Sequence, residues 1–136
     1  MQIIDVNIYW EEKNYCCGWS YPGFGAVLCT ADSIESLKED FKESLAEQIR
    51  SMVDDGEELP QWLADGDYTV EFTLAVSALL RYAERFTTMA ALSRVTGINQ
   101  KQLNNYASSV RIPRPEQRNR IIDGIRTISR QLLSVL

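Results

Sequence analysis

Residues 88–115, TMAALSRVTGINQKQLNNYASSVRIPRP, decide the fold of the C-terminal part of this chain. Thr88 is a residue type that caps helices, and Gly97 can adopt the left-handed conformation that ends a helix. Between them, apolar residues recur at three-residue steps, as on the buried side of a helix: Met89, Leu92 and Val95. The pattern therefore predicts a short helix that stops at a glycine turn.

A second short helix is predicted directly after this turn. Asn99 and Gln102 have the spacing of a capping box, in which each side chain bonds to the backbone of the other residue. Leu103 and Tyr106 then fall on one face of the helix. The other face carries amides and one amine, from Gln100, Lys101, Asn104 and Asn105. Two short helices joined by a glycine turn have the layout of a DNA-reading helix-turn-helix, and these side chains can bond to base edges.

The segment resembles the helix-turn-helix of the phage repressor and Cro family. The likeness lies in LSRVTGI at 92–98, in Leu103 and Tyr106, and in the RIPRP tail at 111–115. Four arginines crowd after the second helix, where phosphate contacts would fix its register: Arg111, Arg114, Arg118 and Arg120. The predicted DNA-binding residues are Asn99, Gln100, Lys101, Asn104, Asn105, Arg111, Arg114 and Arg118. The competing interpretation is a pair of core helices in a bundle.

Charge divides the chain into two parts. The 136 residues include 14 basic and 19 acidic residues, a net charge of −5. Residues 1–76 hold four basic and sixteen acidic residues (net −12), and residues 77–136 hold ten basic and three acidic residues (net +7). We therefore expect an N-terminal domain over 1–75 and a DNA-binding and dimerisation domain over 76–136, with partners of opposite charge.

The N-terminal part alternates strands with one helix. Strands are predicted over 3–10, where apolar residues have period two, and over 15–19, 26–30 and 68–74. Asp32 and Glu35 have the spacing of a capping box that opens a long helix, which ends at Asp54-Asp55-Gly56. The order is β-β-β-α-β, so the predicted fold class is α+β: a sheet with one helix, followed by an all-α helix-turn-helix domain.

This order, followed by a DNA-binding segment, resembles the HicB family of antitoxins. The likeness lies in YCCGWSYPGFGAV (15–27), ADSIESLKEDFKESLAEQI (31–49), DDGEELP (54–60) and YTVEFTL (68–74). It implies a partial RNase H-like sheet, neutralisation of a small basic HicA-like ribonuclease toxin, and repression of the protein's own operon. A domain of net charge −12 suits a cationic toxin. The predicted partner-binding residues are Glu39, Asp40, Glu43, Glu47, Glu57 and Glu58.

The C-terminal residues predict self-association. From Pro115, which suits the first turn of a helix, an apolar stripe runs beyond what one helix-turn-helix can cover. The predicted dimer interface includes Ile125, Ile128, Leu132 and Leu133. Two-fold pairing would set two reading helices about one DNA turn apart, roughly 34 Å, on a near-palindromic operator. The alternative is that the helix end folds back onto the N-terminal sheet.

Catalysis, cofactors and metals are not expected. The chain has no histidine, which excludes Ser-His-Asp and Cys-His chemistry, and it has no P-loop. Cys16, Cys17 and Cys29 are expected to be buried free thiols, not zinc ligands. No run of 18 apolar residues and no signal-peptide pattern is present, so we expect a cytoplasmic protein without a membrane partner.

Two other functions stay open at this point. The first is a stand-alone dimeric transcription regulator with a sensor or oligomerisation domain, which predicts a pocket lined by Trp10, Tyr15, Trp19 and Tyr21. The second is a degenerate nuclease on an RNase H-like sheet, which would need carboxylates converging from adjacent strands. Only Asp5 and Glu71 fall on predicted strands.

Overall fold

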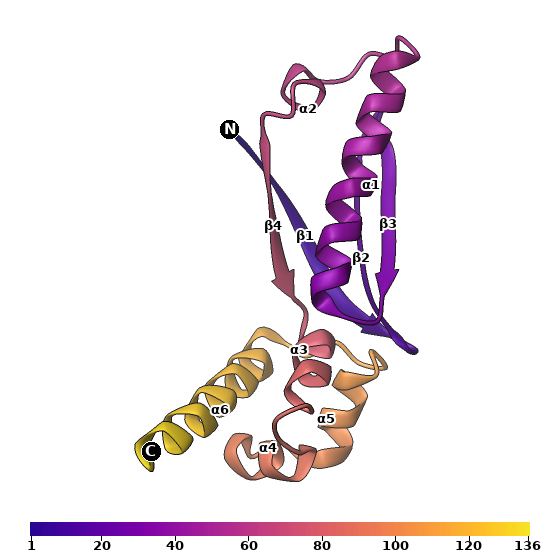
Figure 1. The fold of residues 1–136 in the computed structure, drawn as a ribbon. Helices are drawn as coiled ribbons and strands as arrows, with labels where there is room; N and C mark the ends of the chain where they lie inside the picture. The colour runs from indigo at the N-terminus through magenta and orange to yellow at the C-terminus, as the bar shows by residue number, and fades with distance from the viewer. The chain divides into compact units, whose positions relative to one another are not determined.

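The computed structural model describes all residues from 1 to 136 and contains a four-stranded mixed sheet and six helices (Figure 1). The predicted mixture of strands and helices is therefore confirmed. The chain divides into two compact units. The first comprises Met1–Tyr9 and Lys13–Leu74, and the second comprises Trp10–Glu12 and Ala75–Leu136. None of the helices combines the length and the hydrophobicity that a membrane crossing requires.

The first unit contains the sheet and its helix. Its elements are β1 (Gln2–Glu11), β2 (Asn14–Tyr21), β3 (Gly25–Ala31), α1 (Ile34–Asp54), α2 (Gln61–Ala64) and β4 (Tyr68–Leu74). The strand order is β3-β2-β1-β4. β2 and β3 are antiparallel, whereas β4 runs parallel to β1, in register from Gln2↔Tyr68 to Ile8↔Leu74. The helical crossover between β3 and β4 makes this parallel pairing possible.

Helix α1 covers one face of the sheet. Ile4, Val6 and Ile8 are buried while the residues between them are exposed, as the period of two in β1 predicts. α1 contributes buried residues at every fourth position: Leu37, Phe41, Leu45 and Ile49. On the other face, Leu28 is 79% exposed. The main core of this unit therefore lies between α1 and the sheet face that it covers.

The start of α1 differs from the prediction. Ser33, not Asp32, is the N-cap, and its side chain accepts a hydrogen bond from the Ser36 backbone N–H at 3.1 Å. Glu35 lies in the first turn of the helix and does not take the capping-box position. Serine and aspartate cap equally well, and the sequence offers both in succession, so the spacing alone selected the wrong residue.

The second unit contains four helices: α3 (Val76–Ala83), α4 (Met89–Thr96), α5 (Gln100–Ala107) and α6 (Pro115–Ser134). Helix α5 packs against α3 and α4, and α6 packs against α4. One apolar cluster holds them together, with these fully buried members: Leu80, Leu92, Leu103, Ala107 and Ile121. α3 and the short α2 were not predicted as separate helices, because neither shows a cap residue that bonds its first turn.

The buried side of α4 also differs from the prediction. Leu92 is fully buried and Met89 is partly buried, but Val95 is 36% exposed. Thr96 is buried in its place, at 7% exposure. A three-residue step drifts off a helix of 3.6 residues per turn, and Thr96, four residues after Leu92, stays on the same face.

Candidate functional site

The α4–α5 segment forms two short helices joined by a tight turn. The Thr88 hydroxyl accepts the Ala91 N–H at 3.0 Å, and Gly97 at the C-cap has φ 74°, so both predicted boundary residues are confirmed. Asn99 Oδ1 accepts the Gln102 N–H at 2.8 Å and caps α5. The second half of the predicted capping box is absent, because Gln102 Nε2 donates to the Tyr106 hydroxyl at 2.9 Å.

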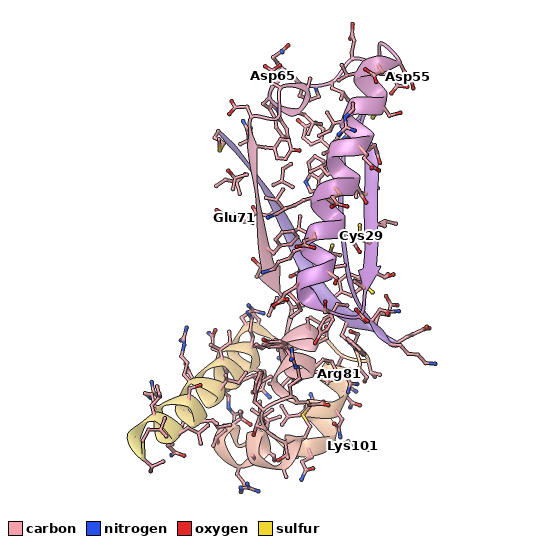
Figure 2. The ribbon with its side chains drawn as sticks, in the orientation of Figure 1. Cys29, Asp55, Asp65, Glu71, Arg81 and Lys101 are labelled. Atoms are coloured by element: carbon pink, nitrogen blue, oxygen red, sulfur yellow. The ribbon has the colours of Figure 1, made fainter.

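Helix α5 has one buried face and one exposed polar face. Leu103 and Tyr106 are buried, as predicted. The polar residues predicted to read DNA lie away from the core: Gln100, Lys101 and Asn104 are exposed, and Asn105 is half-buried. Lys101 extends outward from α5 in Figure 2. Asn99 is exposed, but its side-chain oxygen is engaged in capping.

The chain turns back sharply after α5 and brings arginines to its end. Ser109 has φ 63°, and the Arg111 N–H donates to the Asn105 carbonyl oxygen at 3.2 Å. A cavity of about 520 Å³ opens beside this turn, lined by Gln102, Tyr106, Arg111, Arg114 and the first turn of α6. Both arginines are exposed. The cavity therefore brings the guanidinium groups of Arg111 and Arg114 beside Gln102 and Tyr106 of α5, and its lining also includes the Glu116 carboxylate of α6.

Arg118 and Arg120 lie in α6. Arg118 is half-buried, so it is less accessible than Arg111 and Arg114. Arg120 is engaged within the unit: its Nη2 donates to the Thr96 carbonyl oxygen at 2.7 Å, and its Nη1 donates to Gln117 Oε1 at 2.9 Å. The predicted run of four phosphate-contacting arginines thus includes one that is bound to the end of α4.

The sequence interpretation missed Thr96 and Gly124. The Thr96 hydroxyl donates to the Leu92 carbonyl oxygen at 2.7 Å and accepts the Ile98 N–H at 3.1 Å, which fixes the turn. A Cβ at Gly124 would lie 2.6 Å from Thr96 Cγ2, so α6 approaches α4 closely at this glycine. Gly124 itself is the signal that could have revealed this contact. A glycine inside a helical stretch destabilises the helix relative to alanine, so its presence there indicates close packing against a neighbouring segment.

The predicted dimer residues separate into two groups. Ile125 and Ile128 pack against the apolar cluster of their own unit. Leu132 and Leu133 are 61% and 68% exposed, and the following Val135 and Leu136 are more exposed still. In Figure 1, the last turns of α6 run out beyond the neighbouring helices. Within α6, the unpartnered apolar surface therefore lies at the C-terminal end of the helix.

The predicted partner-binding carboxylates are all on the surface of the first unit. Glu39, Asp40, Glu43 and Glu47 are exposed along α1, and Glu57 and Glu58 are exposed after it. Two ion pairs form in the protein, Arg81–Glu84 and Arg126–Asp123, and both lie in the second unit. Neither of them involves a carboxylate of the first unit.

Carboxylates also gather where α1 ends. Figure 2 shows Asp55 and Asp65 at the same end of the first unit, at the C-terminus of α1 and beside α2. A cavity of about 340 Å³ lies there, with apolar walls that include Ile49 and Leu63 and with Asp54 and Asp65 in its lining. This cavity was not predicted, because its walls come from segments distant in the sequence.

The residues on which the alternative functions depended are also located. Trp19 stacks on Tyr21, with ring centroids 5.7 Å apart, and these two residues line neither of the cavities described above.

Asp5 and Glu71 are register partners on β1 and β4, which brings two carboxylates together on adjacent strands. No group of three or more Cys, Asp or Glu side chains is arranged to hold a metal ion.

The three cysteines are free thiols, as predicted. Cys16 and Cys17 are buried, and Cys29 is half-buried. Burial, together with the nearby Cys29 and Cys16, raises the pKa of the Cys17 thiol from 9.0 to about 12. A thiol with so high a pKa is a poor nucleophile at neutral pH, because the thiolate is the reactive form.

Comparison with known proteins gives no relative: no family model, no curated protein and no solved structure matches this chain.

Proposed function

We propose that the second unit is a helix-turn-helix module that binds double-stranded DNA, with α5 in the major groove. The observation that carries this proposal is the exposed polar face of α5, beside a turn that carries Arg111 and Arg114. Gln and Asn side chains can form bidentate bonds with adenine, and Lys can bond to guanine. Arginines at the end of the helix would contact phosphates and fix its register on the duplex.

The charge of the C-terminal residues supports the same proposal. Residues 77–136 carry a net charge of +7 within a chain of net charge −5. Contacts with phosphate supply most of the sequence-independent affinity of DNA-binding proteins, because each contact releases condensed counterions. The likeness of residues 92–115 to the phage repressor and Cro family adds the layout in which the second helix reads bases.

We further propose that the first unit is a HicB-like antitoxin domain, which neutralises a small basic HicA-like ribonuclease while the whole protein represses its own operon. The β-β-β-α-β order, with β4 parallel to β1, agrees with the partial RNase H-like sheet that the resemblance implies. The exposed carboxylates of α1 and of 57–58 supply the surface for a cationic partner. Matching potentials raise the rate of association, and carboxylates compete with RNA phosphate for a basic groove.

The second candidate function is a stand-alone dimeric transcription regulator whose N-terminal domain serves as a sensor or an oligomerisation module. The exposed leucines at the end of α6 favour an oligomer under either function. What separates the two functions is the partner: the antitoxin requires a small basic toxin, whereas the regulator does not.

The DNA proposal is tested by gel-shift titration of the full-length protein with DNA from upstream of its own gene and with a scrambled duplex, at two salt concentrations. Alanine at Gln100, Lys101 or Asn104 should reduce base preference at single positions by about 1–3 kcal/mol. Alanine at Arg111 or Arg114 should weaken binding to both duplexes alike and flatten the salt dependence. If all five variants bind as the wild type does, α5 is not a reading helix.

The antitoxin proposal is tested by co-expressing the full chain with the product of the adjacent small basic gene. We expect co-purification and relief of growth inhibition. Charge reversal at Glu57 and Glu58, or at Glu39 and Glu43, should slow association at low salt and have little effect at high salt, because exposed charges are screened. The absence of such a neighbour, or a neighbour that is not neutralised, would favour the stand-alone regulator.

A further inference from the structure

The Arg120 side chain bonds to the C-terminal end of α4. Nη2 of Arg120 donates to the carbonyl oxygen of Thr96 at 2.7 Å, and Nη1 donates to Gln117 Oε1 at 2.9 Å. The last carbonyl groups of a helix have no partner within that helix, and they carry the negative end of its dipole. The Arg120 guanidinium donates a hydrogen bond to one of these carbonyl groups and places a positive charge at the negative end of the dipole. α6 therefore holds α4 at the residue where the chain turns toward α5.

Two glycines leave the space that this contact occupies. A Cβ at Gly97 would lie 2.8 Å from Arg120 Nη2, and a Cβ at Gly124 would lie 2.6 Å from Thr96 Cγ2. Gly97 also has φ 74°, where side chains other than glycine are disfavoured. The Arg120 guanidinium and the backbone of α6 thus approach the α4–α5 turn closely at two positions, Gly97 and Gly124.

Thr96 connects this contact to the start of α5. Its hydroxyl accepts the Ile98 N–H at 3.1 Å, and Asn99 caps α5 at the next residue. Ile98 is buried at 4% exposure, so the chain at this point has little freedom to adjust on its own. A displacement of Thr96 is consequently passed to the N-cap Asn99, three residues on, and from there to the first turn of α5, which carries Gln100 and Lys101.

We propose that Arg120 is a positioning residue, which sets the orientation of α5 and thereby the base preference of the protein, without contacting DNA phosphate. The proposal rests on the proposed function, in that α5 is taken as the reading helix. Arg120 is exposed, as Arg111 and Arg114 are, but of these three arginines it alone does not line the open cavity. The guanidinium of Arg120 is instead held against α4 and Gln117 by two hydrogen bonds.

The test compares Arg120→Gln with Arg111→Gln in the full-length protein, on a 20-base-pair duplex that the wild type selects from a random library and on its scrambled form. Arg120→Gln should lower the ratio of the two affinities by roughly 5- to 150-fold, the value of one bidentate base contact, and should leave the salt dependence unchanged. Arg111→Gln should weaken both duplexes alike and flatten the slope by about 0.9. A flattened slope with an unchanged ratio in Arg120→Gln would show a phosphate contact and overturn the proposal.

Arg120→Lys serves as the conservative variant. Its ammonium can still donate to the Thr96 carbonyl oxygen, so it should recover part of the base preference. If the glutamine variant does not fold, Arg120→Met takes its place, because methionine keeps an apolar stem and has no donor for the Thr96 carbonyl oxygen. The lysine variant can have the same ratio of affinities for the selected and scrambled duplexes as the wild type, while the glutamine variant has a lower ratio. This result would support the hydrogen bond to the Thr96 carbonyl oxygen as the essential interaction of residue 120.

A measurement without DNA separates this proposal from the proposed function. In ¹H–¹⁵N spectra of the full chain, Arg120→Gln should shift the amide signals of Gly97, Ile98 and the first turn of α5, and should leave those of β1 in place. A wild type that shows no preference between duplexes contradicts the proposed function alone. Unshifted signals at Gly97 and Ile98 would refute the positioning role of Arg120 whatever the DNA result is.

Discussion

Thr96→Val removes one hydroxyl from the α4–α5 turn and should destabilise the second unit. The Ile98 N–H, which is buried, would lose the Thr96 hydroxyl as its partner. The Leu92 carbonyl loses less, because a carbonyl in the middle of a helix keeps its backbone bond. Leaving a buried donor unsatisfied costs about 1–3 kcal/mol, and for a unit of this size each kcal/mol lowers Tm by roughly 4–8 °C.

Thr127→Val is the matched control for this change. The Thr127 hydroxyl donates to the Asp123 carbonyl oxygen at 2.9 Å, in the same way as Thr96 donates to Leu92. Thr127 is half-buried, and the donor that it accepts from is the exposed Arg130 guanidinium, not a buried N–H. Its loss should therefore stay within about 0.5 kcal/mol, as for most surface substitutions. Thermal and urea unfolding followed by circular dichroism measure both variants. Equal effects of the two substitutions would refute the assignment of the Thr96 hydroxyl as the fixed point of the turn.

Three further outcomes follow from the packing, the ionisation and the exposed surface. Gly124→Ala should lower Tm although alanine favours helices by about 1 kcal/mol, because its Cβ would lie 2.6 Å from Thr96 Cγ2; a rise in Tm would show that α6 can move away. Folding favours the protonated Cys17 thiol, because its pKa is raised from 9.0 to about 12 in the folded protein. Its contribution to the free energy of unfolding should be fully present below pH 9 and decline as the pH rises toward 12. Urea titrations of Cys17→Ala should show a flatter decline of this free energy with pH than those of the wild type. Serine at both Leu132 and Leu133 should convert a dimer into a monomer in light scattering at micromolar concentration, and a monomeric wild type would contradict pairing through α6.

Local signals in the sequence predict much of this fold, because they report on the nearest neighbours along the chain. Alternation along 3–10 and 68–74 predicts the two strands that pair in parallel, and Thr88, Gly97 and Asn99 mark the boundaries of α4 and α5. The errors lie where two local choices compete. Ser33 caps α1 in place of its neighbour Asp32, and Gln102 bonds Tyr106 in place of the backbone.

The candidate site depends on contacts that no local pattern reveals. Arg120 reads in the sequence as one of four basic residues after a reading helix, and only the approach of α6 to α4 shows that it bonds the Thr96 carbonyl oxygen. From the sequence, Ile125 and Ile128 were likewise predicted to form a dimer interface, but in the structure they pack against the core of their own unit. The cavity at the end of α1 joins residues from α1, α2 and β4, so its position depends on the tertiary fold.

The central claim is that α5 reads DNA. The most direct test is to select duplexes from a random library with the full-length protein and to sequence the bound fraction. We predict enrichment of a near-palindromic motif whose half-sites lie about one helical turn apart, roughly 10 base pairs. We also predict that Gln100→Ala changes the preferred base at one position of each half-site and leaves the others as they are. A bound fraction with the same base composition as the input library would contradict the claim.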